Sequence, residues 1–337
     1  MSALLQVEGL TVSTDHDQEA PPILDDVTLT LEPGDVHAVV GESGSGKSMT
    51  AHSVLRMLPG GLTMRARSMR LGGLDLLGAT SRELDEIRGR RISMLYQQPR
   101  RMLDPTATVG SQVAEPLRRH LGMSRRAARH RTVELLDAVG IPEPERRARE
   151  HPHRLSGGMA QRVMIAMALA ARPDVLIADE PTTALDVTVE AQILRLIAAQ
   201  QAETGMSVLF ISHDVGTVAS IADRISVMYA GRIVEDGPTE AVLRSAAHPY
   251  TRALLRCSAL EVDDTGRLHA IAGSASSARS QHTGCRFRPR CEVAAHDVEL
   301  GPRCDAQEPA LTGRGEGRTA RCWVTIGTPD DRERVPA

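Results

Sequence analysis

Residues 36–48 read Val-His-Ala-Val-Val-Gly-Glu-Ser-Gly-Ser-Gly-Lys-Ser, an apolar run that passes into glycine, serine and one lysine. The first five residues predict a short buried strand, and the next eight match the pattern G-x-x-x-x-G-K-[ST]. In this pattern the glycines let backbone N–H groups turn toward phosphate oxygens, and a helix that starts near the lysine adds its positive end. A glycine-rich surface turn would show the same letters, but the flanking strand and helix favour a nucleotide site. The residues expected to bind the nucleotide are Gly41, Glu42, Ser43, Gly44, Ser45, Gly46, Lys47, Ser48 and Met49.

The lysine of this loop is the only lysine among 337 residues, and the other basic side chains are all arginines. An ammonium group is a compact charge on a flexible stem, whereas a guanidinium is a broad planar fork. We therefore expect Lys47 to reach the β- and γ-phosphates, where an arginine would be too bulky, and the Ser48 hydroxyl to coordinate Mg²⁺. Kinases, GTPases and motor ATPases share such a loop, so the loop leaves the class of enzyme open.

Length and composition exclude several classes of protein. At roughly 100–200 residues per domain the length predicts two domains, and the net charge of −3 argues against a strongly basic nucleic-acid surface. The longest apolar run, residues 163–171, is far shorter than the ~18 residues of a membrane helix. The first residues also lack the basic and apolar regions of a signal peptide. We expect a soluble, cytosolic chain.

A second apolar run ends in two carboxylates. Val175-Leu176-Ile177-Ala178 predicts a buried strand, and Asp179, Glu180 and Pro181 follow it directly. Asp179 would hold Mg²⁺, directly or through water. Glu180 would polarise the attacking water as a general base. Acidic pairs at strand ends are common, and this pair carries weight because it follows a phosphate-binding loop.

Between these two sites lies Leu-Ser-Gly-Gly-Met-Ala-Gln-Arg, residues 155–162. Ser156 is a good N-cap for a helix that we expect from about Met159 to Ala171, and Gly157 and Gly158 leave bare N–H groups at its positive end. This is either a capped helix and nothing more, or a second anion site. The string is similar to the signature of ATP-binding-cassette (ABC) ATPases.

Three further segments resemble motifs of that family in the expected order. Gln97 resembles the glutamine that senses Mg²⁺ and the attacking water, and Ala184-Leu185-Asp186 resembles the loop that crosses the dimer interface. His213, after the apolar run 207–211, resembles the switch histidine that contacts the γ-phosphate. The resemblance implies catalytic roles for Glu180, His213 and Gln97. It implies nucleotide contacts for Ser156, Gly157, Gly158 and Asp186, and Mg²⁺ contacts for Ser48, Gln97 and Asp179.

The resemblance also implies a fold and a mechanism. The fold class is α/β: a P-loop NTPase cassette with a RecA-like core, an antiparallel β subdomain and an α-helical subdomain over about residues 89–154. Two cassettes would pack head to tail, with each ATP between one phosphate-binding loop and the other subunit's Ser156 region. Relatives place an aromatic residue near the position of Val12 to stack on adenine, but the first aromatic residue here is Tyr96. We therefore expect adenine to be held by apolar contact, with looser base selectivity or weaker affinity.

About ninety residues follow the cassette, which we expect to span residues 1–246. Residues 247–337 contain His-Pro-Tyr-Thr at 248–251 and a polar stretch over 273–284 that is expected to be a loop or an extended linker. Four of the five cysteines come next. In a chain that is expected to be cytosolic, such a group suggests a metal more than disulfides, although four unrelated thiols remain the alternative. Zinc and an iron–sulfur cluster both take four thiolates. These cysteines are Cys285, Cys291, Cys304 and Cys322.

The tail resembles that of the ATPase subunits of oligopeptide, dipeptide and nickel importers, and the residues around Asp179 resemble the first of their two ATPase subunits. The resemblance implies a [4Fe–4S] cluster on the four cysteines, with zinc as the alternative, beside ATP and Mg²⁺. It implies a second ATPase subunit in a heterodimer, two transmembrane permease subunits and an extracytoplasmic solute-binding protein. We expect no nucleic-acid partner, because acidic residues interleave with the arginines and no aromatic platform accompanies them. The chain would lie peripherally at the cytoplasmic face of the cell membrane and drive import of oligopeptides or dipeptides. A soluble ABC ATPase of translation or DNA repair, and an importer of nickel, are the alternatives.

Overall fold

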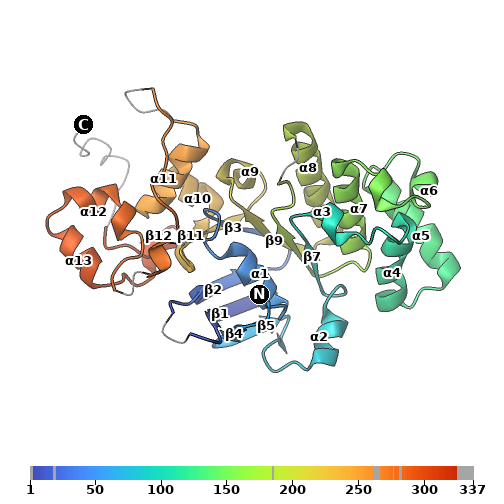
Figure 1. The fold of residues 1–337 in the computed structure, drawn as a ribbon, viewed down its shortest axis with the longest axis horizontal. Coiled ribbons are helices and arrows are strands. Elements are labelled where there is room, and N and C mark those ends of the chain that lie inside the picture. Colours follow the sequence, from blue (N-terminus) through green and yellow to red (C-terminus); the bar gives the residue numbers. More distant parts are fainter. Residues whose placement is uncertain are drawn as a thin grey trace. The chain divides into compact units, whose positions relative to one another are not determined.

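A computed structural model describes residues 3–17, 20–183, 186–261, 266–275, 277–280 and 283–324 of the chain (Figure 1). The chain forms two compact units whose segments alternate along the sequence. We call Met1–Leu5, Leu31–Asp35 and Gly72–Phe210 the helical unit. The P-loop unit consists of Gln6–Thr30, Val36–Leu71 and Ile211–Ala337.

The larger sheet of the P-loop unit contains the predicted strand 36–40. Its strands run in the order β12-β13-β11-β10-β3, with β3 (Val36–Val40), β10 (Arg224–Tyr229), β11 (Arg232–Pro238), β12 (Thr312–Gly315) and β13 (Arg318–Ala320). All five residues of β3 are buried, as expected for a strand covered on both faces. Its one polar residue is His37, and both ring nitrogens of this histidine form hydrogen bonds. Nδ1 lies 2.8 Å from Thr30 O, and Nε2 lies 2.8 Å from Ser226 Oγ. β10 pairs with β3 in parallel and with β11 as an antiparallel hairpin.

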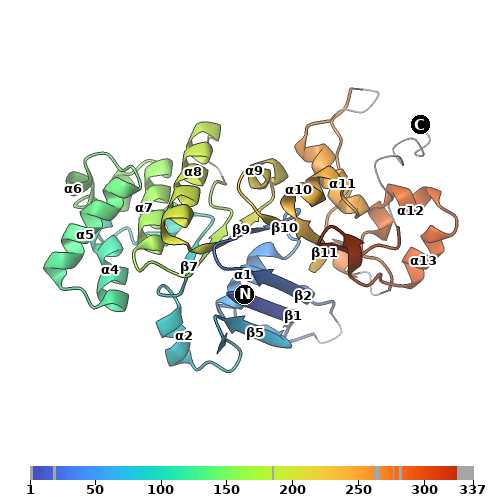
Figure 2. The same cartoon turned by 180° about the vertical axis from the view of Figure 1, so that it is seen from behind.

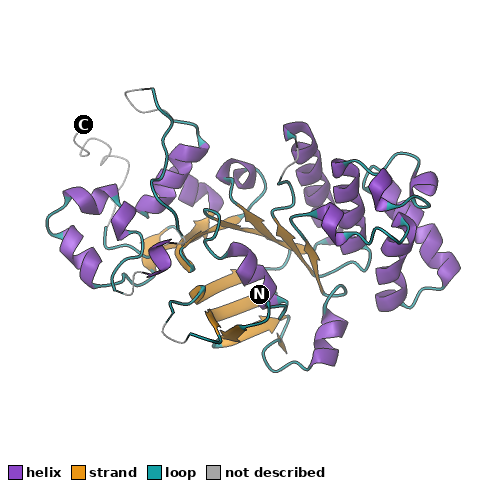
Figure 3. Cartoon of the chain, viewed as in Figure 1, coloured by secondary structure: helices purple, strands orange, loops and turns teal. Residues whose placement is uncertain are grey.

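A smaller antiparallel sheet in the same unit contains β1 (Leu5–Thr14), β2 (Leu24–Leu31), β4 (Leu62–Arg65) and β5 (Ser68–Leu71), and its strands are orange in Figure 3. In β2 the apolar residues Val27, Leu29 and Leu31 are buried and alternate with the exposed Thr28 and Thr30. This period of two is typical of a sheet that is covered on one face. Helix α1 (Lys47–Val54) begins directly after the glycine-rich loop, as predicted.

The helical unit contains β7 (Ile92–Leu95), β8 (Val175–Asp179) and the first four residues of β9 (Ser207–Ser212), in the sheet order β9-β8-β7. The short strand β6 (Leu74–Asp75) precedes them in the chain. Its helices are α2 (Ser81–Ile87), α3 (Pro99–Met102), α4 (Val109–Leu121), α5 (Arg125–Ala138), α6 (Pro144–Arg147), α7 (Gly157–Leu169) and α8 (Val187–Thr204). Figures 1 and 2 show α4, α5 and α6 gathered beside α7. α4 buries Val109, Val113 and Leu117, four residues apart, and thus presents one apolar stripe to its neighbours.

Helix α9 (Val215–Ala219) precedes β10 in the P-loop unit. The chain after β11 adds four more helices to this unit: α10 (Thr239–Arg244), α11 (Pro249–Ser258), α12 (Glu292–His296) and α13 (Leu300–Ala306). The stretch 273–284, predicted as a loop, contains one 3₁₀ turn, Ser277–Ser280, and residues 276, 281 and 282 lie outside the described residues. The division of the chain at residue 246 stays a prediction.

One predicted helix starts and ends at different residues in the structure. We expected a helix from Met159 to Ala171, but α7 spans Gly157–Leu169. The cause is Ser156, whose Oγ accepts a hydrogen bond from Met159 N at 3.3 Å, so the first helical turn already contains both glycines.

Candidate functional site

The glycine-rich loop between β3 and α1 has a backbone that only glycine adopts without strain. Gly41, Gly44 and Gly46 have φ angles of 155°, 77° and 115°. A Cβ on Gly41 would lie 2.2 Å from Met228 O, and a Cβ on Gly46 would lie 2.6 Å from a methyl carbon of Leu24. The loop is therefore packed against β10 and β2, and its glycines are required both for conformation and for space.

Lys47 lies inside this loop rather than in solvent. Its exposed fraction is 4%, and its Nζ donates hydrogen bonds to Gly41 O at 2.7 Å and to Glu42 O at 3.0 Å. The hydroxyl of Ser45 is buried and has no hydrogen-bond partner among the described residues. The loop thus holds a buried ammonium group and an unsatisfied hydroxyl, a combination that suits an anionic ligand.

His213 belongs to the same unit and lies exposed where β9 ends. The next residue, Asp214, caps α9, because its Oδ1 accepts from Gly216 N at 2.8 Å and its Oδ2 from the Thr217 hydroxyl at 2.9 Å. This cap fixes the backbone immediately after His213.

In the helical unit the structure brings together two predicted residues that are far apart in sequence. Gln97 Nε2 donates to Glu180 Oε2 at 2.7 Å, and the Thr183 hydroxyl donates to the same oxygen at 2.9 Å. Glu180 has a φ of 45°, a left-handed conformation that is uncommon for a residue with a Cβ. The chain therefore turns sharply at the end of β8, while Asp179 stays buried at 5% exposure.

The remaining predicted residues of this unit lie at helix N-termini. Ser156 caps α7, and Asp186 caps α8 by accepting from Val189 N at 2.9 Å. A Cβ on Gly157 would meet no described atom within 4 Å, so no contact within the described chain explains this glycine. Ala184 and Leu185, which complete the predicted interface loop, lie outside the described residues.

The four cysteines of the tail line one small cavity, together with His248, Phe287 and Trp323. All are free thiols, and burial raises the pKa of Cys285 to about 12 and that of Cys304 to about 11. Among the described residues, no three His, Cys, Asp or Glu side chains are arranged so that they would hold a metal ion. The four thiols therefore have the number and type that a cluster requires, and all line one cavity. Their sulfur atoms are not close enough together to hold a metal ion, so the predicted cluster is not confirmed.

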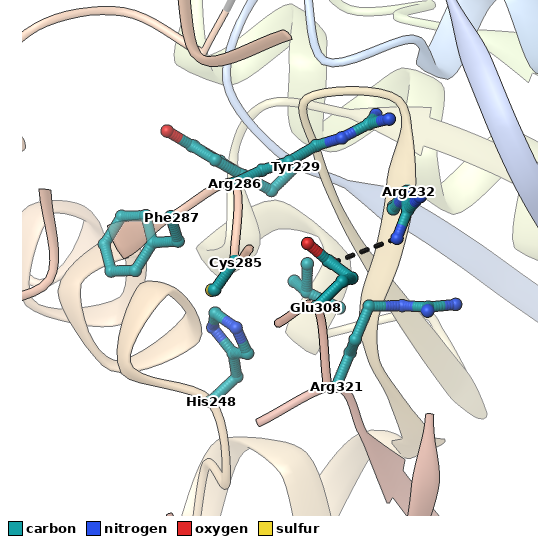
Figure 4. A pocket seen from close by; sticks show the side chains of 9 residues that line it. Tyr229, Arg232, His248, Cys285, Arg286, Phe287, Glu308 and Arg321 are labelled. Atoms are coloured by element: carbon teal, nitrogen blue, oxygen red, sulfur yellow. Dashed lines mark ion pairs between the residues drawn. The ribbon is translucent and has the colours of Figure 1, made fainter. Parts of the chain in front are cut away.

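A second cavity next to it shows how this part of the chain is attached to β10 and β11. Figure 4 shows Cys285, Phe287 and His248 along one side and Arg232, Glu308 and Arg321 along the other. Arg232 forms an ion pair with Glu308 at 3.2 Å, which links β11 to the loop after α13. Burial raises the pKa of Glu308 against the opposing effect of the nearby arginines.

Two residues of the tail to which the sequence did not point contact the glycine-rich loop. Tyr250 and Arg290 both bind Glu42, and neither was assigned a role. The signals available were the His-Pro-Tyr string and an arginine directly before Cys291, but neither indicates the distant loop that it contacts.

Two segments of the chain match models of known protein families. Residues 24–183 match the model of the family described as ABC transporter, and residues 234–297 match that described as oligopeptide/dipeptide transporter, C-terminal region. Two proteins of Brucella abortus, strain 2308, whose names describe them as peptide import ATP-binding proteins, are similar along nearly their whole length. One is 45% identical, covering 96% of this chain and 98% of its own, and the other 46% identical, covering 97% and 96%.

The chain belongs to the ABC transporter family.

Solved structures agree with this membership. The ATP-binding cassette MJ0796, solved as a dimer bound to ADP and Pi, superposes with a TM-score of 0.62 at 28% identity, covering 70% of this chain and 98% of that chain. CbiO1 from Clostridium perfringens, part of the ABC transporter complex cbiONQ, gives a TM-score of 0.61 at 25% identity, covering 73% and 92%. The predicted ABC cassette fold is thus confirmed, and the protein is an ATPase of this family. No helix among the described residues of this ABC ATPase has both the length and the apolar character needed to cross a membrane.

Proposed function

We propose that this ABC ATPase powers the import of oligopeptides or dipeptides through a pair of membrane permeases. The observation that carries the proposal is the match of residues 234–297 to the C-terminal region of oligopeptide and dipeptide transporters, beside the similarity to the two Brucella proteins. That segment contains the His-Pro-Tyr string and two of the four cysteines. In this assignment the cassette extends to residue 246, and residues 247–337 form a small cysteine-bearing domain.

The phosphate site would use residues 41–49. Lys47 would turn its ammonium group from the carbonyls of Gly41 and Glu42 toward the β- and γ-phosphates, and the loop amides would donate to the same oxygens. The Ser48 hydroxyl and the Asp179 carboxylate, with the Gln97 amide oxygen, are the oxygen ligands that Mg²⁺ prefers. The ion, when bound, neutralises charge on the phosphates.

Hydrolysis would depend on Glu180. Gln97 and Thr183 both hold Oε2 of its carboxylate, which fixes the direction in which the side chain points. A carboxylate that is held in this way can accept a proton from the attacking water. His213 would contact the γ-phosphate.

A complete site would need a second ATPase subunit, with which the chain forms a heterodimer. Gly157 supports this proposal. A Cβ at this position would meet no described atom within 4 Å, so there is room beside Gly157 for a ligand or a partner. Ser156, Gly157 and Gly158 would meet the ATP of the other subunit, and Asp186 would lie at the interface. The assembly would include two permeases and a solute-binding protein, and this chain would lie at the cytoplasmic face of the membrane.

Transport assays test the proposal directly. The ATPase is co-purified with its permeases, reconstituted in liposomes and supplied with labelled dipeptides, longer peptides or Ni²⁺. We expect ATP-dependent uptake of peptides that is lost in Lys47→Ala. Uptake of Ni²⁺ without peptides would overturn the assignment of substrate. A chain that hydrolyses ATP but never associates with permeases would instead favour a soluble role.

We further propose that Cys285, Cys291, Cys304 and Cys322 hold a [4Fe–4S] cluster. Support comes from the cavity that all four line and from burial, which raises the pKa of their thiols and leaves thiolates unstable there without a cation. The full chain, purified without oxygen, should absorb visible light and contain iron and sulfide. Cys291→Ser should lose this absorbance. Cys257→Ser is the matched control, because Cys257 donates to His269 O and is not among the cavity residues. A colourless preparation that contains zinc would refute the cluster.

A further inference from the structure

Residues of the tail contact the phosphate-binding loop, and all of these contacts lie within the P-loop unit. Glu42 N donates a hydrogen bond to the Tyr250 hydroxyl at 2.9 Å, and the Glu42 carboxylate forms an ion pair with Arg290 at 3.1 Å. Arg279 donates to Gly44 O. The loop is thus attached at its backbone and at a side chain to residues more than 200 positions away.

Arg290 is itself held firmly. Its side chain is 7% exposed, and its guanidinium also donates to the Tyr229 hydroxyl at 3.2 Å and to Ile271 O at 3.0 Å. The guanidinium carbon lies 5.6 Å from the centre of the Tyr229 ring. Because these contacts fix Arg290 independently of Glu42, the arginine positions the loop rather than the reverse.

Tyr250 is fixed by an aromatic cluster. Its ring centre lies 4.6 Å from that of Tyr229 and 5.4 Å from that of Phe287, and its exposed fraction is 0%. Three of the six aromatic residues in the chain therefore meet at this point. A ring buried among other rings has little freedom to turn, so the hydroxyl stays where Glu42 N needs its acceptor.

Glu42 in turn controls the groups that meet phosphate. Its carbonyl oxygen accepts from Lys47 Nζ at 3.0 Å and from Ser45 N at 3.1 Å. A displacement of Glu42 would therefore move the ammonium group and an amide of the loop together. The amide of Glu42, by contrast, is committed to Tyr250 and is not aimed at a ligand.

We propose that Arg290 and Tyr250 are positioning residues for the ATP site, through which the tail pre-organises the phosphate-binding loop by holding Glu42. Both residues act on Glu42, and neither is among the residues assigned to nucleotide binding. A loop that is already ordered binds ATP without the entropic cost of ordering it, so the effect falls on ATP affinity and leaves the chemical step intact. The inference rests on the ATPase identity of the chain and is independent of peptide import and of the iron–sulfur cluster.

Binding of ATP·Mg²⁺ to the full chain tests the proposal. We expect the Kd to rise about fivefold in Arg290→Gln and about threefold in Tyr250→Phe, the equivalent of one hydrogen bond each. The KM for ATP should rise in parallel while kcat at saturating ATP stays within twofold of wild type. Arg290→Lys, which keeps the charge, should recover part of the affinity. Arg288→Gln is the matched control, since it removes an ion pair to Asp305 from the same turn without touching the loop.

A double-mutant cycle and hydrogen exchange separate positioning from a general loss of structure. Glu42→Gln and Arg290→Gln should not add in the double variant, because both remove the same ion pair. Amide exchange in the free protein should rise in residues 42–46 of Arg290→Gln and stay unchanged in β10. Unchanged affinity in Arg290→Gln and Tyr250→Phe would overturn the proposal, as would an equal loss in Arg288→Gln. If Arg290→Gln does not fold, Tyr250→Phe and Glu42→Gln decide the matter by the same measurements.

Discussion

Exchange of Lys47 for arginine tests whether the phosphate site needs a compact ammonium group. The side chain is 4% exposed, and its Nζ lies 2.7 Å from Gly41 O and 3.0 Å from Glu42 O. An arginine keeps the charge, but its planar fork is longer and carries five N–H donors in a fixed geometry. It cannot occupy this place without displacing the carbonyls of the loop, so the variant separates charge from shape.

The size of the effect follows from the hydrogen bonds that are lost. A hydrogen bond to a charged group contributes about 1.5–3 kcal/mol, and we expect Lys47→Arg to lose one such bond to the phosphates. ATP affinity should therefore fall about 10- to 100-fold. Lys47→Ala, which also loses the charge, should bind more weakly still.

Two measurements check this reasoning. Equilibrium dialysis gives the ATP Kd, with Arg126→Lys as control, because Arg126 is exposed on α5. Acetylation followed by peptide mass spectrometry gives a second measure, since Lys47 is the only lysine of the chain. Bound ATP should protect it from the reagent. If Lys47→Arg binds ATP within threefold of wild type, the argument from shape is wrong; labelling that ATP does not slow would contradict the placement of the ammonium group.

Three further predictions concern turnover, base selectivity and acid stability. Glu180→Gln should bind ATP normally but release phosphate at least about 100-fold more slowly, and normal turnover would exclude Glu180 as general base. Because no aromatic residue precedes Tyr96, GTP should compete with ATP within roughly tenfold, whereas strong preference for ATP in a competition assay would reveal another means of recognising adenine. Burial lowers the pKa of His248 to about 3 from its usual 6.5, so its contribution to stability is complete above pH 6.5 and is lost as the pH falls toward 3. Between pH 8 and pH 5 wild type should lose about 2 kcal/mol more stability than His248→Asn, as measured by urea unfolding with Trp323 fluorescence; equal losses would refute this.

Local patterns in the sequence predicted local structure well. The strand 36–40, the helix that starts at Lys47 and the strand that begins at Val175 all lie where they were expected. Each depends on residues close together in the chain: apolar runs, glycines at positive φ and capping side chains. Helix α7 also depends on a neighbouring residue, its N-cap Ser156, which the sequence indicated correctly. The predicted first residue of the helix was nevertheless two positions too late.

Contacts between distant residues were decided only by the tertiary structure. Gln97 and Glu180 are 83 residues apart, and Glu42 and Arg290 are 248 residues apart. The sequence by itself determined that a phosphate-binding loop with one lysine, an acidic strand end and a capped glycine pair exist, because their geometry follows from neighbouring residues. Only the packing of strands and rings determined that the tail holds Glu42, because side chains far apart in sequence meet only where the intervening elements fix their separation in space.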